Sequence, residues 1–321
     1  MKKGYTAFVG LLMGLAEVVP GVSGGTIAFV GGIYERFINA IKSVDKIALS
    51  YLLKGRLREF AKKVDFLFLV LLLGGMGIGL VIGVFGISYL LEHHPIGIWS
   101  FFFGLILASS IYLGSQIPVW NLRNVISILV GAVIAYMITV QSPSSGQDAL
   151  WAYLLSGAIA ISAMILPGIS GSFVLLLMGM YSLVLAQAKD FLSGFEMGAF
   201  IKLVAFGIGV LIGLAIFSRV LSWLFSRYKY TTYAVLTGFV FGSLNKIWPW
   251  KRAVLGQDET GDLIDLRDMK TMPEGMRIIR EENLSPFHEA IGDPHVLSAV
   301  LMFILGILLI FVLSKMEGKR F

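Results

Sequence analysis

The sequence predicts an all-α polytopic membrane protein of two inverted-topology repeats, each a re-entrant helical hairpin followed by three transmembrane helices. Three observations lead to this fold class: an apolar composition, long uncharged runs, and two copies of a Pro-Gly-x-Ser-Gly motif. Of 321 residues, 57% are hydrophobic and 14% charged, and the mean hydropathy is +0.83. A soluble chain is about half apolar and about a quarter charged, so an ordinary soluble protein is excluded.

The first repeat is expected over residues 1–147. Its hairpin, 5–41, has an incoming arm that is apolar except for Glu17, a break at Pro20-Gly21, and an outgoing arm without charge as far as Tyr34. A full crossing needs about 20 apolar residues, so these short arms are expected to dip into the membrane and return. Three uncharged runs follow as predicted spans, at about 66–91, 95–114 and 124–140.

The second repeat is expected over residues 148–321. Its hairpin, 149–188, is one uncharged run that is too long for a single helix and is broken at Pro167-Gly168. The predicted spans lie at about 197–225, 230–246 and 296–314. The long loop 247–295 has no counterpart in the first repeat and is interpreted as an extracytoplasmic cap rather than the site of activity.

An internal alignment supports two repeats. Residues 10–42 pair with 157–189 without a gap, and 77–88 then pair with 207–218. Lys and Arg flank the first hairpin on both sides, and Arg227 and Lys229 follow the 197–225 span, so both termini are expected in the cytoplasm. Three spans separate the hairpins, and because three is odd the second hairpin enters from the opposite face.

The paired motifs carry the strongest chemical signal. Proline ends the incoming half-helix, glycine permits positive φ, and a serine at the N-cap satisfies free amides of the outgoing half-helix. Amides and hydroxyls at a helix N-terminus bind anions, phosphate above all, and transporters with inverted repeats build substrate sites from broken helices. The alternative is that these kinks only serve packing. The predicted phosphate-binding residues are Gly21, Ser23, Gly24, Gly25, Thr26, Gly168, Ser170, Gly171 and Ser172.

Three charged residues are candidates for coupling or gating. Glu17 stands in an apolar arm, where an ionised carboxylate costs roughly 2.5–3.5 kcal/mol and normally marks a function. It could carry a proton or coordinate a cation, or it could cap free amides of the hairpin tip. Glu35 and Arg36 end the outgoing arm, where they form an interfacial ion pair or Arg36 meets an anionic headgroup.

No cofactor, metal site or nucleic-acid partner is predicted. The chain has no cysteine, its net charge of +6 is not arranged as a basic stripe interleaved with aromatics, and the adjacent His93 and His94 lack a third ligand.

The two motifs, together with Gly14-Leu15-Ala16 and Gly32-Ile33-Tyr34-Glu35, closely resemble the bacterial PopT-type polyprenyl-phosphate transporter family, formerly a membrane domain of unknown function. The resemblance covers nearly the whole chain. It implies a flippase in the bacterial cytoplasmic membrane that returns undecaprenyl phosphate, the lipid carrier of cell-wall precursors, from the outer to the cytoplasmic leaflet. It also implies that the turns at Ser23 and Ser170 hold the phosphate.

Two other functions stay open. The same half-helix ends could serve a transporter or channel for a small soluble ion. A membrane lipid phosphatase ranks third, because no intramembrane Ser-His or paired-carboxylate spacing occurs, and we therefore expect no enzyme. The sequence leaves the coupling ion, proton or sodium, and the oligomeric state undetermined.

Overall fold

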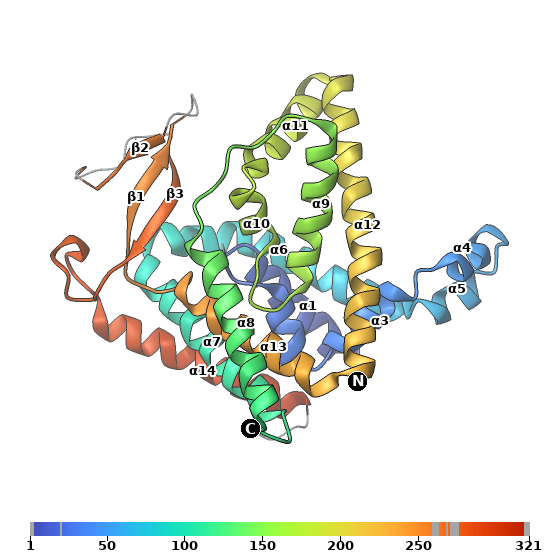
Figure 1. Ribbon diagram of the computed structural model, residues 1–321, viewed down its shortest axis with the longest axis horizontal. Coiled ribbons are helices and arrows are strands. Elements are labelled where there is room, and N and C mark those ends of the chain that lie inside the picture. The colour runs from blue at the N-terminus through green and yellow to red at the C-terminus, as the bar shows by residue number, and fades with distance from the viewer. Residues whose placement is uncertain (1–2, 20, 259–262, 268, 270–275, 318–321) are drawn as a thin grey trace.

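The computed structural model describes residues 3–19, 21–258, 263–267, 269 and 276–317 (Figure 1). Pro20 of the first motif and the terminal charges Lys2, Lys319 and Arg320 therefore lie outside the described residues. Within them, five helices are long and apolar enough to cross a membrane: α6 (Phe66–His93), α7 (Pro95–Ser115), α8 (Leu122–Val140), α12 (Met197–Arg227) and α14 (Val296–Glu317). The chain is mostly helical, as predicted for a polytopic membrane protein.

Each predicted hairpin consists of three helices rather than two arms. The outgoing arms break again at Gly32 (φ 65°) and Gly179 (φ 68°), where only glycine adopts a left-handed backbone without strain. The second outgoing arm bends by 103° at this break. The helices are α1 (Lys3–Glu17), α2 (Gly24–Val30) and α3 (Tyr34–Lys42) in the first hairpin, and α9 (Leu150–Ile165), α10 (Gly171–Leu177) and α11 (Met180–Gly194) in the second.

The remaining elements connect these units. Two short helices, α4 (Lys46–Leu53) and α5 (Leu57–Lys63), lie between α3 and α6. The predicted span 230–246 is shorter than expected: α13 (Lys229–Gly242) ends in a 3-10 turn (Ser243–Asn245). The loop after it contains a three-stranded antiparallel sheet that the sequence analysis did not predict. Its order is β2-β1-β3, with β1 (Lys251–Gln257), β2 (Leu263–Asp265) and β3 (Arg277–Asn283), and a 3-10 turn (Glu289–Ile291) follows.

Helix packing joins the two halves. α1 packs on α6 and α9 on α12, whereas α7 packs on α14 and α8 on α13, across the halves. Glycines permit the closest approaches: a Cβ at Gly79 would meet the Leu11 carbonyl of α1, and one at Gly209 would meet the Leu154 carbonyl of α9. Small residues at these positions allow the helix backbones to approach closely.

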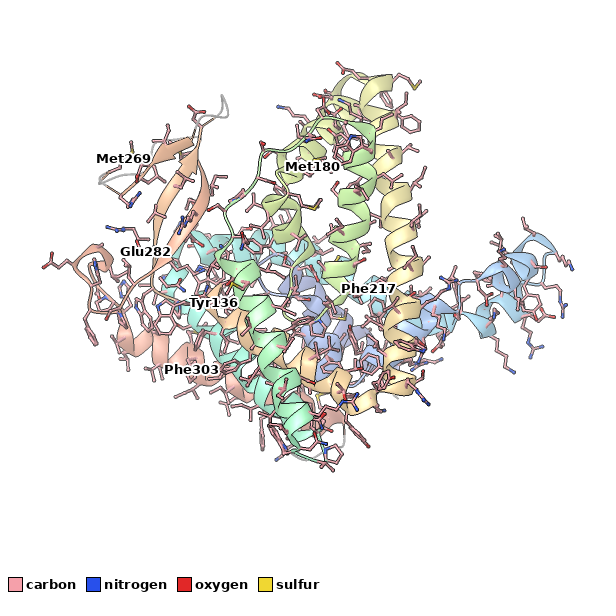
Figure 2. The ribbon with its side chains drawn as sticks, in the orientation of Figure 1. Tyr136, Met180, Phe217, Met269, Glu282 and Phe303 are labelled. Carbon is pink, nitrogen blue, oxygen red and sulfur yellow. The ribbon has the colours of Figure 1, made fainter. Side chains whose placement is uncertain are left out.

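The faces that point away from this core are apolar. Figure 2 shows side chains standing out along α8 and α12, among them Tyr136, which is exposed in the absence of lipid. The sheet and the α4–α5 pair lie on opposite sides of the helical body (Figure 1).

Candidate functional site

The two motif turns lie directly against each other at the junction of the halves. Gly21 (φ 90°) and Gly168 (φ 83°) adopt the left-handed turn conformation in equivalent places. The Thr26 hydroxyl accepts a hydrogen bond from the Gly168 amide at 3.0 Å, and the Ser23 hydroxyl donates to the Leu166 carbonyl at 3.2 Å. Residues more than 140 positions apart thus form one structural unit.

The first turn satisfies its own amides. The Ser23 hydroxyl accepts from the Gly25 amide at 3.1 Å, so the predicted N-cap is confirmed. The Gly24 amide donates to Oε1 of Glu17 at 2.9 Å, the capping role that the sequence left as an alternative. Ser23 and Thr26 are buried, with exposed fractions of 1% and 0%. An anion could reach these amides only after Glu17 moved away.

The second turn is less complete. Ser170 is the N-cap of α10, as predicted, and its hydroxyl lies 2.9 Å from that of Ser172. The residue equivalent to Glu17 is Met164, whose thioether sulfur is only a weak acceptor and does not replace the carboxylate as a partner for a backbone amide. Among the described residues, no acceptor is bonded to the amides of Gly171 and Ser172. Ser172 is exposed, whereas Ser170 is buried.

Ser172 lines a cavity of about 330 Å³ between the second turn and the sheet, which we call the sheet-side cavity. Trp99, Phe173, Lys246 and Glu281 also line it, and a smaller polar cavity of about 160 Å³ adjoins it at Lys246. The Lys246 stem lies against Gly21, and its ammonium group is 4.9 Å from the centre of the Phe173 ring. Lys246 thus touches the first turn and the helix that follows the second.

Lys246 is not among the site residues predicted from the sequence, because it stands at the end of the apolar run 230–246. Its partner Glu281 lies on β3 and accepts from Lys246 at 3.2 Å. Lys251 on β1 approaches the same carboxylate oxygen at 3.6 Å. Burial lowers the pKa of Lys251 to about 8, against the opposing attraction of Glu281. Burial alone would raise the pKa of Glu281, but the two ammonium groups outweigh it and lower that pKa.

An apolar groove of about 520 Å³ runs beside the second turn, between α8, α9, α10 and α12. Ile138 and Ile169 line both this groove and a small pocket that also contains Ser170 and Lys246. The second turn therefore stands between lysine and hydroxyl groups on one side and a hydrocarbon-like surface on the other.

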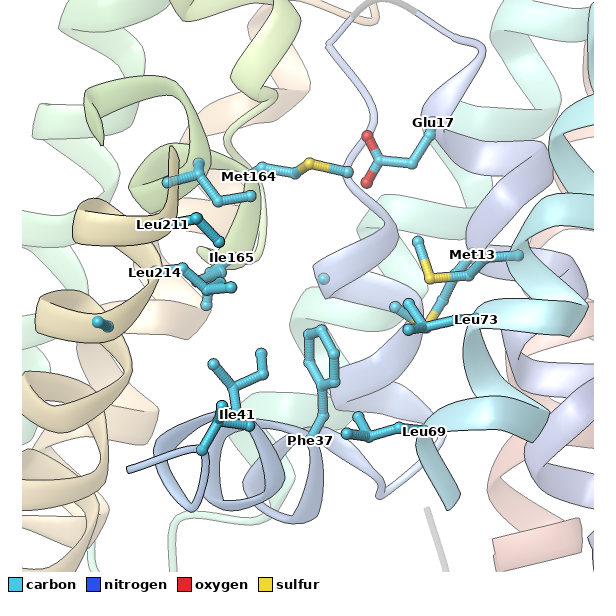
Figure 3. A pocket seen from close by; sticks show the side chains of 15 residues that line it. Met13, Glu17, Phe37, Ile41, Leu69, Leu73, Met164, Ile165, Leu211 and Leu214 are labelled. Atoms are coloured by element: carbon cyan, nitrogen blue, oxygen red, sulfur yellow. The ribbon is translucent and has the colours of Figure 1, made fainter. Parts of the chain in front are cut away.

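A second apolar cavity, of about 530 Å³, lies on the other side of the paired turns. Figure 3 shows the Glu17 carboxylate facing Met164 across this cavity, with Phe37, Ile41 and Leu69 on the side away from the turns. We call it the Glu17 cavity.

Glu35 and Arg36 lie outside the paired turns and do not pair with each other. Arg36 pairs with Asp65 at 2.6 Å, and Glu35 pairs with Lys229 at 2.8 Å. Glu35 belongs to a seam between α3 and the α12–α13 corner. In the same seam Lys42 donates to Ser222 at 3.0 Å.

Comparison with known proteins identifies the family. The family model described as undecaprenyl phosphate translocase-like matches residues 13–263. A Vibrio cholerae protein named polyprenyl-phosphate transporter is 42% identical over 283 residues, which cover 88% of this chain and 85% of the relative. A Staphylococcus aureus protein of the same name is 32% identical over 252 residues, or 75% of this chain and 84% of that relative. No solved structure matches the chain.

These findings confirm the resemblance drawn from the two motifs. The relatives are named as transporters and not as enzymes, and five apolar helices make this chain an integral membrane protein. The chain belongs to the undecaprenyl phosphate translocase-like family.

Proposed function

We propose that this protein is a flippase that returns undecaprenyl phosphate from the outer to the cytoplasmic leaflet of the bacterial cytoplasmic membrane. The observation that carries the proposal is the position of the second turn, between the lysine-lined sheet-side cavity and the apolar groove. A polyprenyl phosphate likewise joins a charged phosphate headgroup to an apolar isoprenoid tail. The relatives' names support the same substrate class.

The headgroup would bind at the second turn. The amides of Gly171 and Ser172, the hydroxyls of Ser170 and Ser172, and the ammonium of Lys246 offer donors and positive charge to phosphate oxygens. Hydrogen bonds to an ionised group contribute about 1.5–3 kcal/mol each, so a few suffice for selective capture. The isoprenoid tail would lie in the groove lined by Ile138, Ile169 and their neighbours, continuous with lipid.

Alternating access would follow from a difference between the two hairpins. α3 packs against α12 of the other half, through the seam of Glu35, Lys42 and Ser222. α11 packs instead on α12 of its own half, and among the described helices it has no comparable contact with α6. We interpret this as closure on the α3 side and opening on the α11 side, in a pair of inverted repeats.

The basic residues of α4 and α5 support a cytoplasmic location for the α3 side, and hence for both termini. The sheet, on the opposite side of the helical body, would then lie outside (Figure 1). Glu17 is the candidate for proton coupling, because its carboxylate leaves the Gly24 amide free only when it moves or changes its bonding.

The test is leaflet-resolved transport by protein reconstituted in liposomes, with a fluorescent polyprenyl phosphate as substrate and a polyprenol without phosphate as control. We expect transfer of the phosphate lipid alone, and a rate that depends on an imposed proton or sodium gradient. Conduction of inorganic phosphate or chloride without lipid transfer would replace this proposal by a soluble-ion transporter. Release of free phosphate from the lipid would indicate a phosphatase.

A further inference from the structure

Three charged side chains form a compact cluster where the inserted sheet meets the helices. Oε2 of Glu281 lies 3.2 Å from Nζ of Lys246 and 3.6 Å from Nζ of Lys251. The exposed fractions of these side chains are 24%, 17% and 6%, so the cluster is largely withdrawn from water. Two ammonium groups thus share one carboxylate oxygen.

The cluster carries an excess of positive charge. Removing an ion from water is costly, and one carboxylate neutralises only one of the two ammonium groups. Arg280 lines the adjoining polar cavity and adds a further positive charge. A single carboxylate therefore leaves one positive charge of the cluster without a counter-charge.

The cluster also lies on a route to the second turn. Nζ of Lys251 lies 3.5 Å from the centre of the ring of Trp99, a residue that lines the sheet-side cavity. Lys246 lies over Phe173, the neighbour of Ser172 in sequence. Lys246, Glu281 and Ser172 all line the sheet-side cavity, so a ligand that displaces Glu281 from Lys246 lies in the cavity that contains Ser172.

We propose that Lys246 and Lys251 form a loading site, where a phosphate monoester first binds before it reaches the second turn. In the absence of this ligand the Glu281 carboxylate of the inserted sheet occupies the same position, and the phosphate displaces it. A phosphate monoester carries about −1.5 to −2 charge near neutral pH and three acceptor oxygens, which suits two ammonium groups. The inference rests on the proposed function and deepens it. It also gives β1 and β3 a part in binding through Lys251 and Glu281, in a loop expected to be only a cap.

Competition for the lysines has a distinctive consequence. Glu281→Gln removes the competing charge, so the site should bind phosphate more tightly, by about tenfold if the change corresponds to about 1.4 kcal/mol. Lys246→Met keeps the stem over Gly21 but removes the ammonium, and should weaken binding by a similar factor. Lys246→Arg should retain most of the affinity, which separates loss of charge from loss of folding.

The chain offers a matched control on the same strand. Glu282 follows Glu281, so its side chain points to the other face of the sheet, where it pairs with Arg252 at 3.5 Å. Glu282→Gln removes the same charge from the same strand without touching the lysines. It should bind as the wild type does.

The experiment measures equilibrium binding of a fluorescent short-chain prenyl phosphate to the full chain in nanodiscs, with inorganic phosphate and the corresponding prenol as competitors. Tighter binding by Glu281→Gln than by Glu282→Gln is the expected result. If inorganic phosphate gains affinity as well, the site recognises the phosphate alone, and if only the prenyl phosphate gains, the lipid tail contributes.

Equal affinities of the Glu281→Gln, Glu282→Gln and wild-type proteins would overturn the loading site. Failure of the proposed function is a separate result: wild-type protein that binds prenyl phosphate in nanodiscs but moves none between leaflets of liposomes would reject the flippase and leave the binding site standing.

Discussion

The turn after α1 and the turn after α9 have the same backbone conformation and different surroundings. Gly21 and Gly168 share a left-handed φ, and a serine follows each at the N-cap of a seven-residue helix. In the first turn Glu17 occupies the Gly24 amide, whereas in the second the equivalent position is Met164, and the amides of Gly171 and Ser172 have no acceptor in the described part of the chain.

The difference teaches that a repeated motif need not be two equal binding sites in one conformation. The first turn is closed by its own carboxylate and buried. The second faces a cavity that holds a lysine. If the first turn opens and the second closes during transport, the two turns need not bind phosphate at the same time.

The largest expected effect concerns the glycines of the two motif turns, Gly21 and Gly168, both of which have positive φ. A Cβ at Gly168 would meet the Phe239 backbone, which cannot move easily, whereas a Cβ at Gly21 would meet the flexible Lys246 side chain. A left-handed alanine lowers the free energy of unfolding by about 1–2 kcal/mol at either position, and overpacking lowers it by a further amount of about 1–3 kcal/mol at Gly168. Gly168→Ala should therefore lower the Tm in detergent more than Gly21→Ala. Equal losses would mean that the turns are packed alike.

Ser172→Ala should impair transport without affecting the fold. Its hydroxyl is exposed to the sheet-side cavity, and loss of one hydrogen bond to a phosphate should reduce transport roughly ten- to a hundredfold. Leaflet-resolved transport and the Tm are measured together. An unchanged transport rate would remove the second turn from the site.

Thr26→Val should show the opposite pattern. Valine has nearly the same shape but leaves the buried Gly168 amide without its acceptor, which costs about 1–3 kcal/mol. The Tm should fall while prenyl phosphate affinity of the folded protein stays near the wild-type value. A selective loss of affinity with an unchanged Tm would instead place Thr26 at the phosphate.

Glu17→Gln tests the carboxylate that distinguishes the first turn from the second. Glutamine keeps a carbonyl oxygen for the Gly24 amide but cannot release a proton, so the fold should persist. Transport measured with and without a proton gradient should lose its dependence on that gradient. Dependence equal to the wild type would assign coupling to another group.

The smallest expected effect is at the start of the second hairpin. Lys202 donates a hydrogen bond to the Asp148 carboxylate at 2.7 Å, and Tyr153 donates another at 2.8 Å. These two bonds hold the pKa of Asp148 below its ordinary value of 3.8. This stabilisation is present above the unfolded pKa and is lost as the pH falls through the folded one. Because Asp148 is half-exposed, Asp148→Asn should cost less than about 1 kcal/mol at pH 7. The Tm difference from wild type should shrink as the pH approaches 3, and a difference that grew would contradict the assignment.

Much of this molecule follows from local chemistry that the sequence contains. Uncharged runs of about 20 residues must be helices in a bilayer, because no other single-segment structure pairs all backbone groups. Glycine and serine at fixed places in two motifs determined two turns and their N-caps. The second breaks also follow from the sequence, because Gly32 and Gly179 stand at equivalent positions of the two aligned segments.

Contacts between distant segments were decided only by the tertiary structure. No local pattern states that Thr26 meets Gly168, that Glu35 pairs with Lys229, or that Lys246 lies over Gly21. Lys246 and Glu281 are 35 positions apart, and their pairing depends on how an inserted sheet folds back onto the helices. Propensity and hydrophobic pattern act over a few residues, whereas the position of a charge in a cavity is fixed by the packing of the whole chain.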